Sequence, residues 1–243
     1  MIPAGLLLLA DSRLPSGGHS HSGGVEALVD RGLLRTEADL AAFLAGRLAT
    51  GGAVMAAGAA AGCALSGVQE SHPHALSGHE GGFPEPGWGE WQAALDARLP
   101  AVATREASCA QGAALLRTAA RTWATPALDA LRALPRAHHP LVLGAAVAAT
   151  GAGPGDAAVL ALHHLVGGAC TAAVRLLGLD PLGVAAVAAR AGRDAEPLAV
   201  AACADAIAAV AAGDPGLLPA DGNPLYDVLA QLHRQSEATL FAS

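Results

Sequence analysis

The chain has 243 residues, of which 53% are hydrophobic and only 14% are charged, and its net charge is −7 with arginine as the only basic residue besides histidine. A polypeptide of this length and hydrophobicity buries a substantial core, in one large domain or two small ones, which excludes intrinsic disorder. The acidic balance and the lack of any basic run argue against nucleic acid or an anionic membrane surface as a partner.

The composition also predicts the fold class. Alanine, the residue with the highest helix propensity, makes up about a quarter of the chain, and aromatic residues only 3%. With few runs of β-branched and aromatic residues, an all-α fold is expected. The charged content is well below the roughly 25% of an ordinary soluble domain. We therefore expect a partner chain or a second copy to cover part of the surface.

The predicted helices follow from apolar periodicity and from their end signals. The first apolar run, 3–11, has no preceding basic residues and is too short for a signal peptide. Thr36 and Asp39 form a capping-box pattern, and Thr125, Asp180 and Asn223 each precede a proline suited to the first helical position. Glycines end several apolar runs, at Gly32, Gly178 and Gly213. We expect about eight to ten helices among the segments 3–11, 22–31, 37–65, 88–98, 101–124, 126–134, 139–150, 155–177, 181–191, 196–212 and 224–241.

Two segments bear on the domain organisation. Residues 66–87 are rich in glycine, proline and histidine and lack periodicity, so we expect a flexible surface insertion within a single domain spanning 1–243. The apolar stretch 141–174 is divided by Gly151, Gly153 and Gly155 into pieces that we expect to be shorter than the roughly 20 residues of a membrane span. A soluble cytoplasmic protein without membrane contact is the expectation.

The densest group of functional residue types lies in 14–26, Leu-Pro-Ser-Gly-Gly-His-Ser-His-Ser-Gly-Gly-Val-Glu. Two glycine pairs flank two histidines, and the second pair leads into a helix, where backbone N–H groups could bind an anion or a partner carboxylate. From the residues alone, a structural turn with Ser22 as the N-cap is as well supported as a functional loop. His19 and His21 could bind Ni²⁺ or Zn²⁺, which leaves a metal-dependent enzyme as an alternative, although no third ligand lies nearby in the sequence.

Other candidate motifs are weak. The glycines of 150–156 lack the spacing of a dinucleotide-binding turn, and His163 and His164 lie about 100° apart on a helix, so that they cannot easily bind one ion. The four cysteines form no Cys-x-x-Cys pair and are expected to be small core residues. No nucleophile elbow is present. The sequence therefore predicts neither an active site nor a bound cofactor or metal.

Several motifs resemble those of one family. Residues 9–12, 14–18 and 21–24 together with Glu26 resemble L-A-D-S-x-L-P-T/S-G-G-F-x-H-S-G-G-L-E, the amino-terminal signature of the UreF family of urease accessory proteins, with His19 and Val25 as departures. Later family motifs have counterparts, in the same order, in 105–116, 139–144 and 172–176. The carboxy terminus keeps Asp227, His233, Leu240, Phe241 and Ser243, but it has Arg234 where glutamate is usual.

The resemblance implies an all-α, non-catalytic protein that forms a homodimer. Such a protein binds UreD, also called UreH, on the apo-urease subunits and recruits the GTPase UreG for nickel insertion. The resemblance assigns the loop 17–26 to the surface facing UreG and the tail 227–243 to UreD. The residues expected to bind partners are Pro15, Gly17, Gly18, His21, Ser22, Gly23, Gly24, Glu26, Arg105, Ser108, Asp227, His233, Leu240 and Phe241. A generic helical scaffold is a further alternative.

Overall fold

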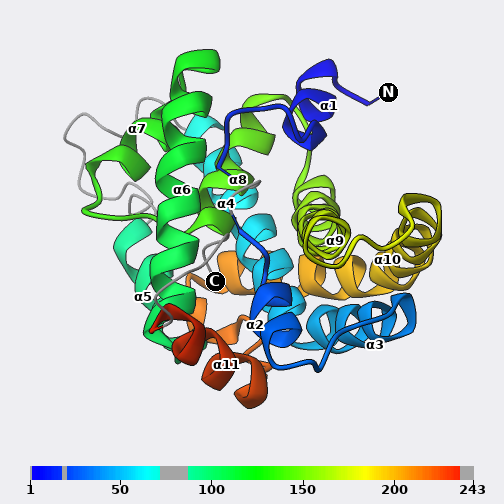
Figure 1. Cartoon of the computed structure of the whole chain (residues 1–243). Coiled ribbons are helices and arrows are strands. Elements are labelled where there is room, and N and C mark those ends of the chain that lie inside the picture. The colour runs from blue at the N-terminus through cyan, green and yellow to red at the C-terminus, as the bar shows by residue number, and fades with distance from the viewer. Residues whose placement is uncertain (1, 18–20, 72–86, 236–243) are drawn as a thin grey trace.

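The computed structural model describes residues 2–17, 21–71 and 87–235, which form helices and no β-strand (Figure 1). The elements in chain order are α1 (Ala4–Ala10), α2 (Val25–Asp30), α3 (Glu37–Arg47), the π-helical turn η2 (Leu48–Gly52), α4 (Ala53–Ser71), α5 (Trp88–Arg98), α6 (Val102–Thr122), α7 (Pro126–Ala133), α8 (His139–Ala149), α9 (Pro154–Leu177), α10 (Pro181–Ala212), the 3₁₀ turn η3 (Pro215–Leu217) and α11 (Pro224–Arg234). Since α3, η2 and α4 run on as one helix, the described part of the chain has ten helices. The all-α prediction is confirmed.

Helix α4 lies at the centre of the bundle. It packs against α8, α9 and α10, while α6 packs on the outer side of α8 (Figure 1). The crossing of α4 and α8 is very close, because a Cβ atom on Gly144 would clash with the Ala59 carbonyl, and one on Gly62 would lie 2.6 Å from the Leu141 carbonyl oxygen. Glycine and alanine at these crossings allow the helix backbones to approach closely, which explains how an alanine-rich sequence fills its core.

The predicted end signals operate as expected. Thr36 and Asp39 form a reciprocal capping box, with the Thr36 N–H donating to Asp39 Oδ2 at 3.0 Å and the Asp39 N–H donating to Thr36 Oγ1 at 3.2 Å. Thr125, Asp180 and Asn223 accept hydrogen bonds from the first turns of their helices. Gly32, Gly178 and Gly213 adopt left-handed conformations with φ between +63° and +65°.

Three segments differ from the expectation. The predicted helices 181–191 and 196–212 are one helix of 32 residues, which continues through Pro197. Pro197 and Arg193 both lie on the exposed side, so water can hydrogen-bond the Arg193 carbonyl that proline leaves without a donor. Residues 66–71, expected in the insertion, extend α4, and 72–86 lie outside the described residues. Helix α11 ends at Arg234 rather than 241, and 236–243 also lie outside them.

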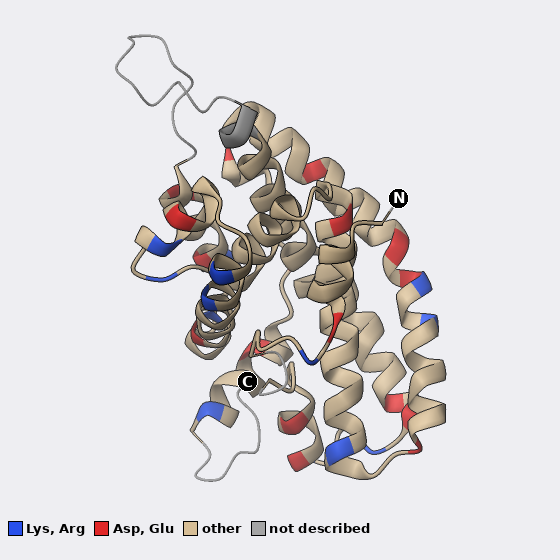
Figure 2. Cartoon of the chain, turned by 90° about the horizontal axis from the view of Figure 1, so that it is seen from above, with Lys and Arg blue, Asp and Glu red and all other residues tan. Residues whose placement is uncertain are grey.

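Three helices are long and apolar enough to cross a membrane by length and composition alone: Glu37–Gly67, Pro154–Leu177 and Pro181–Ala212. The expectation that 141–174 holds no such segment is therefore wrong for its second half, because α9 has 24 residues. In the first two helices 67% and 56% of the most apolar window is buried inside the protein, which accounts for their hydropathy. In α10 only 28% is buried, so this helix exposes apolar surface. Charged residues are sparse over most of the bundle (Figure 2).

Candidate partner-binding site

The turn that precedes α2 lies against α6. The Pro15 carbonyl accepts a hydrogen bond of 2.8 Å from Thr118 Oγ1, and a Cβ atom on Gly17 would lie 3.0 Å from the Ala114 side chain. Gly17 has φ +80°, a conformation that favours glycine. Pro15 and Gly17 thus hold the turn on α6. Gly18, a further predicted partner-binding residue, and His19, a candidate metal ligand in the alternative interpretation, lie outside the described residues.

The start of α2 uses Ser22 in a different way from the one expected. The N-cap position is occupied by Gly24, with φ +99°, and not by Ser22. The buried Ser22 hydroxyl oxygen nevertheless accepts hydrogen bonds from the Gly24 and Glu26 N–H groups, at 3.3 and 3.4 Å. Ser22 therefore accepts hydrogen bonds from backbone N–H groups at the helix start, which is what an N-cap side chain does. It does so from a position two residues before the N-cap residue.

The second glycine pair makes room for an aromatic ring from α11. A Cβ atom on Gly24 would clash with the Tyr226 ring. The Arg47 guanidinium lies over the same ring, with Arg47 Cζ 3.8 Å from the ring centroid. Arg47 is only 8% exposed. Sequence reasoning missed both residues, although Arg47 lies seven residues after Leu40 on the apolar face of its helix and could have been noticed as a buried charge.

A buried contact between a carboxylate and an imidazole joins α2 to α11. Glu26 Oε2 lies 3.2 Å from His233 Nε2, and the two residues are 4% and 2% exposed. Asp30 Oδ2 lies 3.8 Å from His233 Nδ1. Glu26 and His233, which the resemblance assigns to two different partners, thus face one another and not solvent. They fix the position of α11 on the start of α2.

The outer face of α11 is apolar and exposed. Leu225, Val228 and Leu232 are 62%, 57% and 43% exposed, and their spacing of three and four residues places them along one side of the helix. Arg234, a departure from the family pattern, forms an ion pair with Glu106 on α6 at 2.8 Å. Leu240 and Phe241, which the sequence assigns to the same tail, lie outside the described residues.

Predicted site residues from three distant segments meet at one cavity of about 370 Å³. His21 and Gly23 reach it from the turn before α2, Ser108 from α6 and Asp227 from α11. Burial raises the pKa of the half-buried Asp227 carboxyl, an effect that the nearby Arg47 partly offsets. The fold therefore brings together His21 and Asp227, which are 206 positions apart in the sequence. Only the family motifs related these residues before the structure was known.

Several histidines also line this cavity. Burial lowers the pKa of His139 to about 3, with the neighbouring His164 and His21 lowering it further. The pKa of His164 falls to about 4 through burial, although its Nε2 donates a 2.9 Å hydrogen bond to the Leu9 carbonyl. The rings of His139 and His164 lie 6.1 Å apart, and both are neutral at physiological pH. Within the described residues, no three His, Cys, Asp or Glu side chains form a metal-binding cluster.

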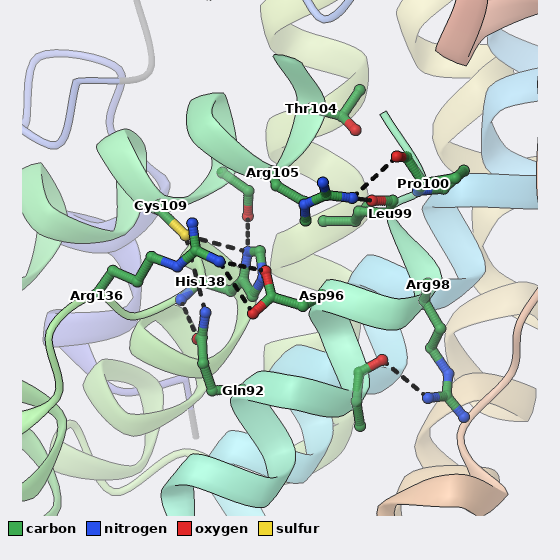
Figure 3. A network of polar contacts seen from close by, with 12 residues as sticks. Gln92, Asp96, Arg98, Leu99, Pro100, Thr104, Arg105, Cys109, Arg136 and His138 are labelled. Carbon is green, nitrogen blue, oxygen red and sulfur yellow. Dashed lines mark hydrogen bonds and ion pairs between the residues drawn. The ribbon is translucent and has the colours of Figure 1, made fainter. Parts of the chain in front are cut away.

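Ser108 belongs to a second polar network (Figure 3). Its hydroxyl lies 3.0 Å from His138 Nδ1, and His138 Nε2 lies 3.2 Å from Asp96 Oδ1, which also pairs with Arg136 at 3.1 Å. Desolvation lowers the pKa of the fully buried His138, while Asp96 acts in the opposite direction. Gln92 Oε1 accepts a 2.8 Å hydrogen bond from the His138 backbone N–H.

The order serine, imidazole, carboxylate is that of a hydrolase triad, but the surroundings do not suit acyl transfer. Ser108 lies in the interior of α6, where neighbouring backbone N–H groups donate to helix carbonyls and are not available to a developing oxyanion. Cys109 Sγ also approaches His138 Nδ1, at 3.6 Å, and burial raises the pKa of its thiol. Within the described structure, the network holds α5, α6 and the start of α8 together.

Arg105 is engaged in the same region. Its guanidinium donates to the carbonyls of Leu99 and Pro100, at 2.6 and 2.9 Å (Figure 3). These bonds fix the connection between α5 and α6. The side chain that the sequence assigns to a partner therefore serves the fold of this chain.

Comparison with known proteins gives a consistent family signal. A model of the UreF family matches residues 34–192. The chain is 40% identical to the urease accessory protein UreF of Mycolicibacterium vanbaalenii, over 99% of this chain and 98% of that protein. It is 41% identical to the urease accessory protein UreF of a Mycobacterium species (strain JLS) and 36% identical to that of Mycobacterium tuberculosis, over 98% of this chain and 97% of each relative.

Proposed function

Because the chain belongs to the UreF family of urease accessory proteins, we propose that it acts as a non-catalytic adaptor in urease maturation. In this role it binds UreD on the apo-urease subunits and recruits the GTPase UreG, which supplies nickel to the urease active site. It acts as a soluble, cytoplasmic homodimer. The observation that carries the adaptor role is the two-faced helix α11, which is fixed to the bundle on one side and apolar and exposed on the other.

The outer face of α11 is the proposed UreD contact. Leu225, Val228 and Leu232 form the kind of anchor row with which an amphipathic helix enters an apolar groove. The inner face keeps this row in place, because Tyr226 contacts both Gly24 and Arg47 and because His233 contacts Glu26. The residues that follow α11, among them Leu240 and Phe241, belong to the same proposed UreD contact.

The loop 17–26 is the proposed UreG-facing surface. Glu26 is a positioning residue in this proposal, since its buried carboxylate holds α11 and the turn together and does not reach the surface. To modulate a GTPase, the surface must bind one of its conformations more tightly than the other, which is typically worth about 1–3 kcal/mol.

Co-expression tests the proposal. Urease subunits, UreD and UreG are produced with and without this chain, and urease activity should require it. Replacing Leu225, Val228 and Leu232 together by glutamate should abolish co-purification with UreD while helicity by circular dichroism stays unchanged, because all three side chains are exposed. Val159→Glu, which changes an exposed apolar residue on α9, is the matched control and should leave UreD binding intact. Retention of UreD by the triple variant contradicts the assigned contact.

A further inference from the structure

Arg47 is a buried cation with hydrogen-bond donors that the described chain does not use. It is the last residue of α3 and is only 8% exposed. None of the ion pairs among the described residues includes Arg47, and within the same residues its Nε has no hydrogen-bond partner. Burial of a charge is unfavourable unless the charge is paired or hydrogen-bonded. The contact with the Tyr226 ring supplies part of this compensation and no acceptor atom.

The residues after Arg47 make room for its guanidinium. The π-helical turn η2 begins at the next residue, and π-helical turns are frequent at functional sites. A Cβ atom on Gly51, within this turn, would lie 2.7 Å from Arg47 Nη1. Because Gly51 has no side chain, the guanidinium can lie close to the turn. Both residues line the cavity of about 370 Å³ that is described above.

The cavity has the composition of a site for a small molecule. Its lining residues come from α3, η2, α4, α5, α6, α8, α9 and α11, so it lies inside the bundle. Phe43, Val54 and Met55 contribute apolar surface. His139 also lines it, and among the described residues its buried Nδ1 has no hydrogen-bond partner. Sites for small molecules are typically apolar cavities of about 300–1,000 Å³ with a few polar groups that orient the ligand.

The charges around the cavity favour a ligand with one negative charge. Asp11 and Arg98 line it but are engaged, Asp11 in a salt bridge and Arg98 in hydrogen bonds to backbone carbonyl groups. Asp221 is exposed, whereas the half-buried Asp227 is near enough to interact electrostatically with Arg47. A monoanion suits this balance better than a phosphate monoester, which carries a charge of about −1.5 to −2 at neutral pH. Arginine can bind a carboxylate through two parallel hydrogen bonds.

We propose that the cavity binds a small organic carboxylate with an apolar body, and that its carboxylate group accepts hydrogen bonds from the Arg47 guanidinium. The apolar body lies against the side chains of Phe43, Val54 and Met55, where its burial contributes to affinity. This site lies inside the chain, so it is distinct from the partner contacts of the adaptor role and does not depend on them.

Isothermal titration calorimetry of the full-length chain with hexanoate tests the site. One hexanoate should bind per chain. Acetate, which lacks the apolar chain, and 1-hexanol, which lacks the charge, should each bind at least about tenfold more weakly. Arg47→Gln should raise the Kd for hexanoate by about tenfold or more, because it removes the charge-assisted hydrogen bonds. Asp227→Asn should lower this Kd, because it removes a negative charge near the site.

Two glycine substitutions keep the charge of Arg47 and decide the matter if Arg47→Gln fails to fold. Gly51→Ala should weaken hexanoate binding, because the added Cβ atom displaces Arg47 Nη1. Gly46→Ala is the matched control and should bind like the wild type, because an added Cβ atom there has no neighbour within 4 Å. Arg132→Gln, which removes an exposed arginine, controls for the change in net charge.

Three results would overturn the proposal. The first is a wild-type chain that does not bind hexanoate. The second is a wild-type Kd for hexanoate in both the Arg47→Gln and the Gly51→Ala variants, which would place any binding elsewhere. The third is binding of 1-hexanol or inorganic phosphate as tight as that of hexanoate, because the ligand class would then not be an organic carboxylate. Circular dichroism of every variant checks the fold.

Discussion

Acidification should destabilise this fold through its buried histidines. Burial lowers the pKa of His139 from 6.5 to about 3, so the folded state keeps this imidazole neutral while the unfolded chain takes up a proton below about pH 6.5. The unfolded state then binds more protons, and stability falls as the pH falls. The contribution of His139 is complete above its unfolded pKa and is lost progressively down to its folded pKa.

The size of the effect follows from the pKa difference. Each pH unit below about 6.5 costs about 1.4 kcal/mol per buried histidine, so His139 alone should lower the free energy of unfolding by about 2 kcal/mol at pH 5. His164, whose pKa falls to about 4, acts in the same direction. The His164 side chain is only partly buried, so we expect it to contribute less than His139 to the loss of stability. Together they should remove about 2–4 kcal/mol between about pH 7.5 and pH 5.

Urea unfolding followed by circular dichroism at several pH values measures the slope. In His139→Gln the larger of the two titrating contributions is gone, so the loss of stability on acidification should fall by about half or more relative to the wild type. Val159→Gln is the matched control, because Val159 is an exposed residue on α9 that carries no titrating group, so its replacement should leave the slope unchanged. Equal slopes in the wild type and His139→Gln would refute the reasoning and attribute acid sensitivity to other groups.

Three substitutions test the close contacts of the fold. Glu26→Ala should lower the free energy of unfolding by about 1–3 kcal/mol, because it removes the carboxylate that contacts the buried His233 ring. Glu26→Gln should lower it less, and equal losses in the two variants would contradict a role for this contact. Gly24→Ala should lower the free energy of unfolding by about 1–3 kcal/mol, because Gly24 has a positive φ and an added Cβ atom would clash with Tyr226. Hydrogen exchange in α11 at the wild-type rate would contradict this prediction. Gly144→Ala should lower the melting temperature by separating α4 from α8, and an unchanged melting curve would show that the crossing can relax.

The helices were predictable because local chemistry determines their ends. Thr36, Thr125 and Asp180 accept hydrogen bonds from backbone N–H groups nearby in sequence, and Gly178 and Gly213 adopt the left-handed conformation that terminates a helix. Such interactions span four residues or fewer, so a single sequence contains them. The continuity of α10 through Pro197 was not predictable in this way, because it depends on packing against α4 and α9 along the whole helix.

The candidate site was predictable only in part. The motifs indicated the loop 17–26 and the carboxy-terminal helix, but not that they pack on one another. The contact of Tyr226 with Gly24 and Arg47 joins three segments distant in sequence, and no local pattern encodes such a contact. The network of His138 with Asp96 was missed for the same reason, since its members are 42 residues apart.

The placement of the motif residues separates two roles that a sequence motif cannot distinguish. Ser22, Glu26, His233 and Arg105 all direct their polar atoms toward this chain, to helix N–H groups, to one another or to loop carbonyls. Their substitution would therefore weaken partner binding indirectly, by releasing the elements that present the surface. The exposed apolar side chains of α11 have no such internal task, so their substitution should weaken binding at unchanged stability. Measuring binding and unfolding on the same variants separates the two classes: Glu26→Ala should reduce both quantities, whereas Leu225→Glu should reduce binding alone.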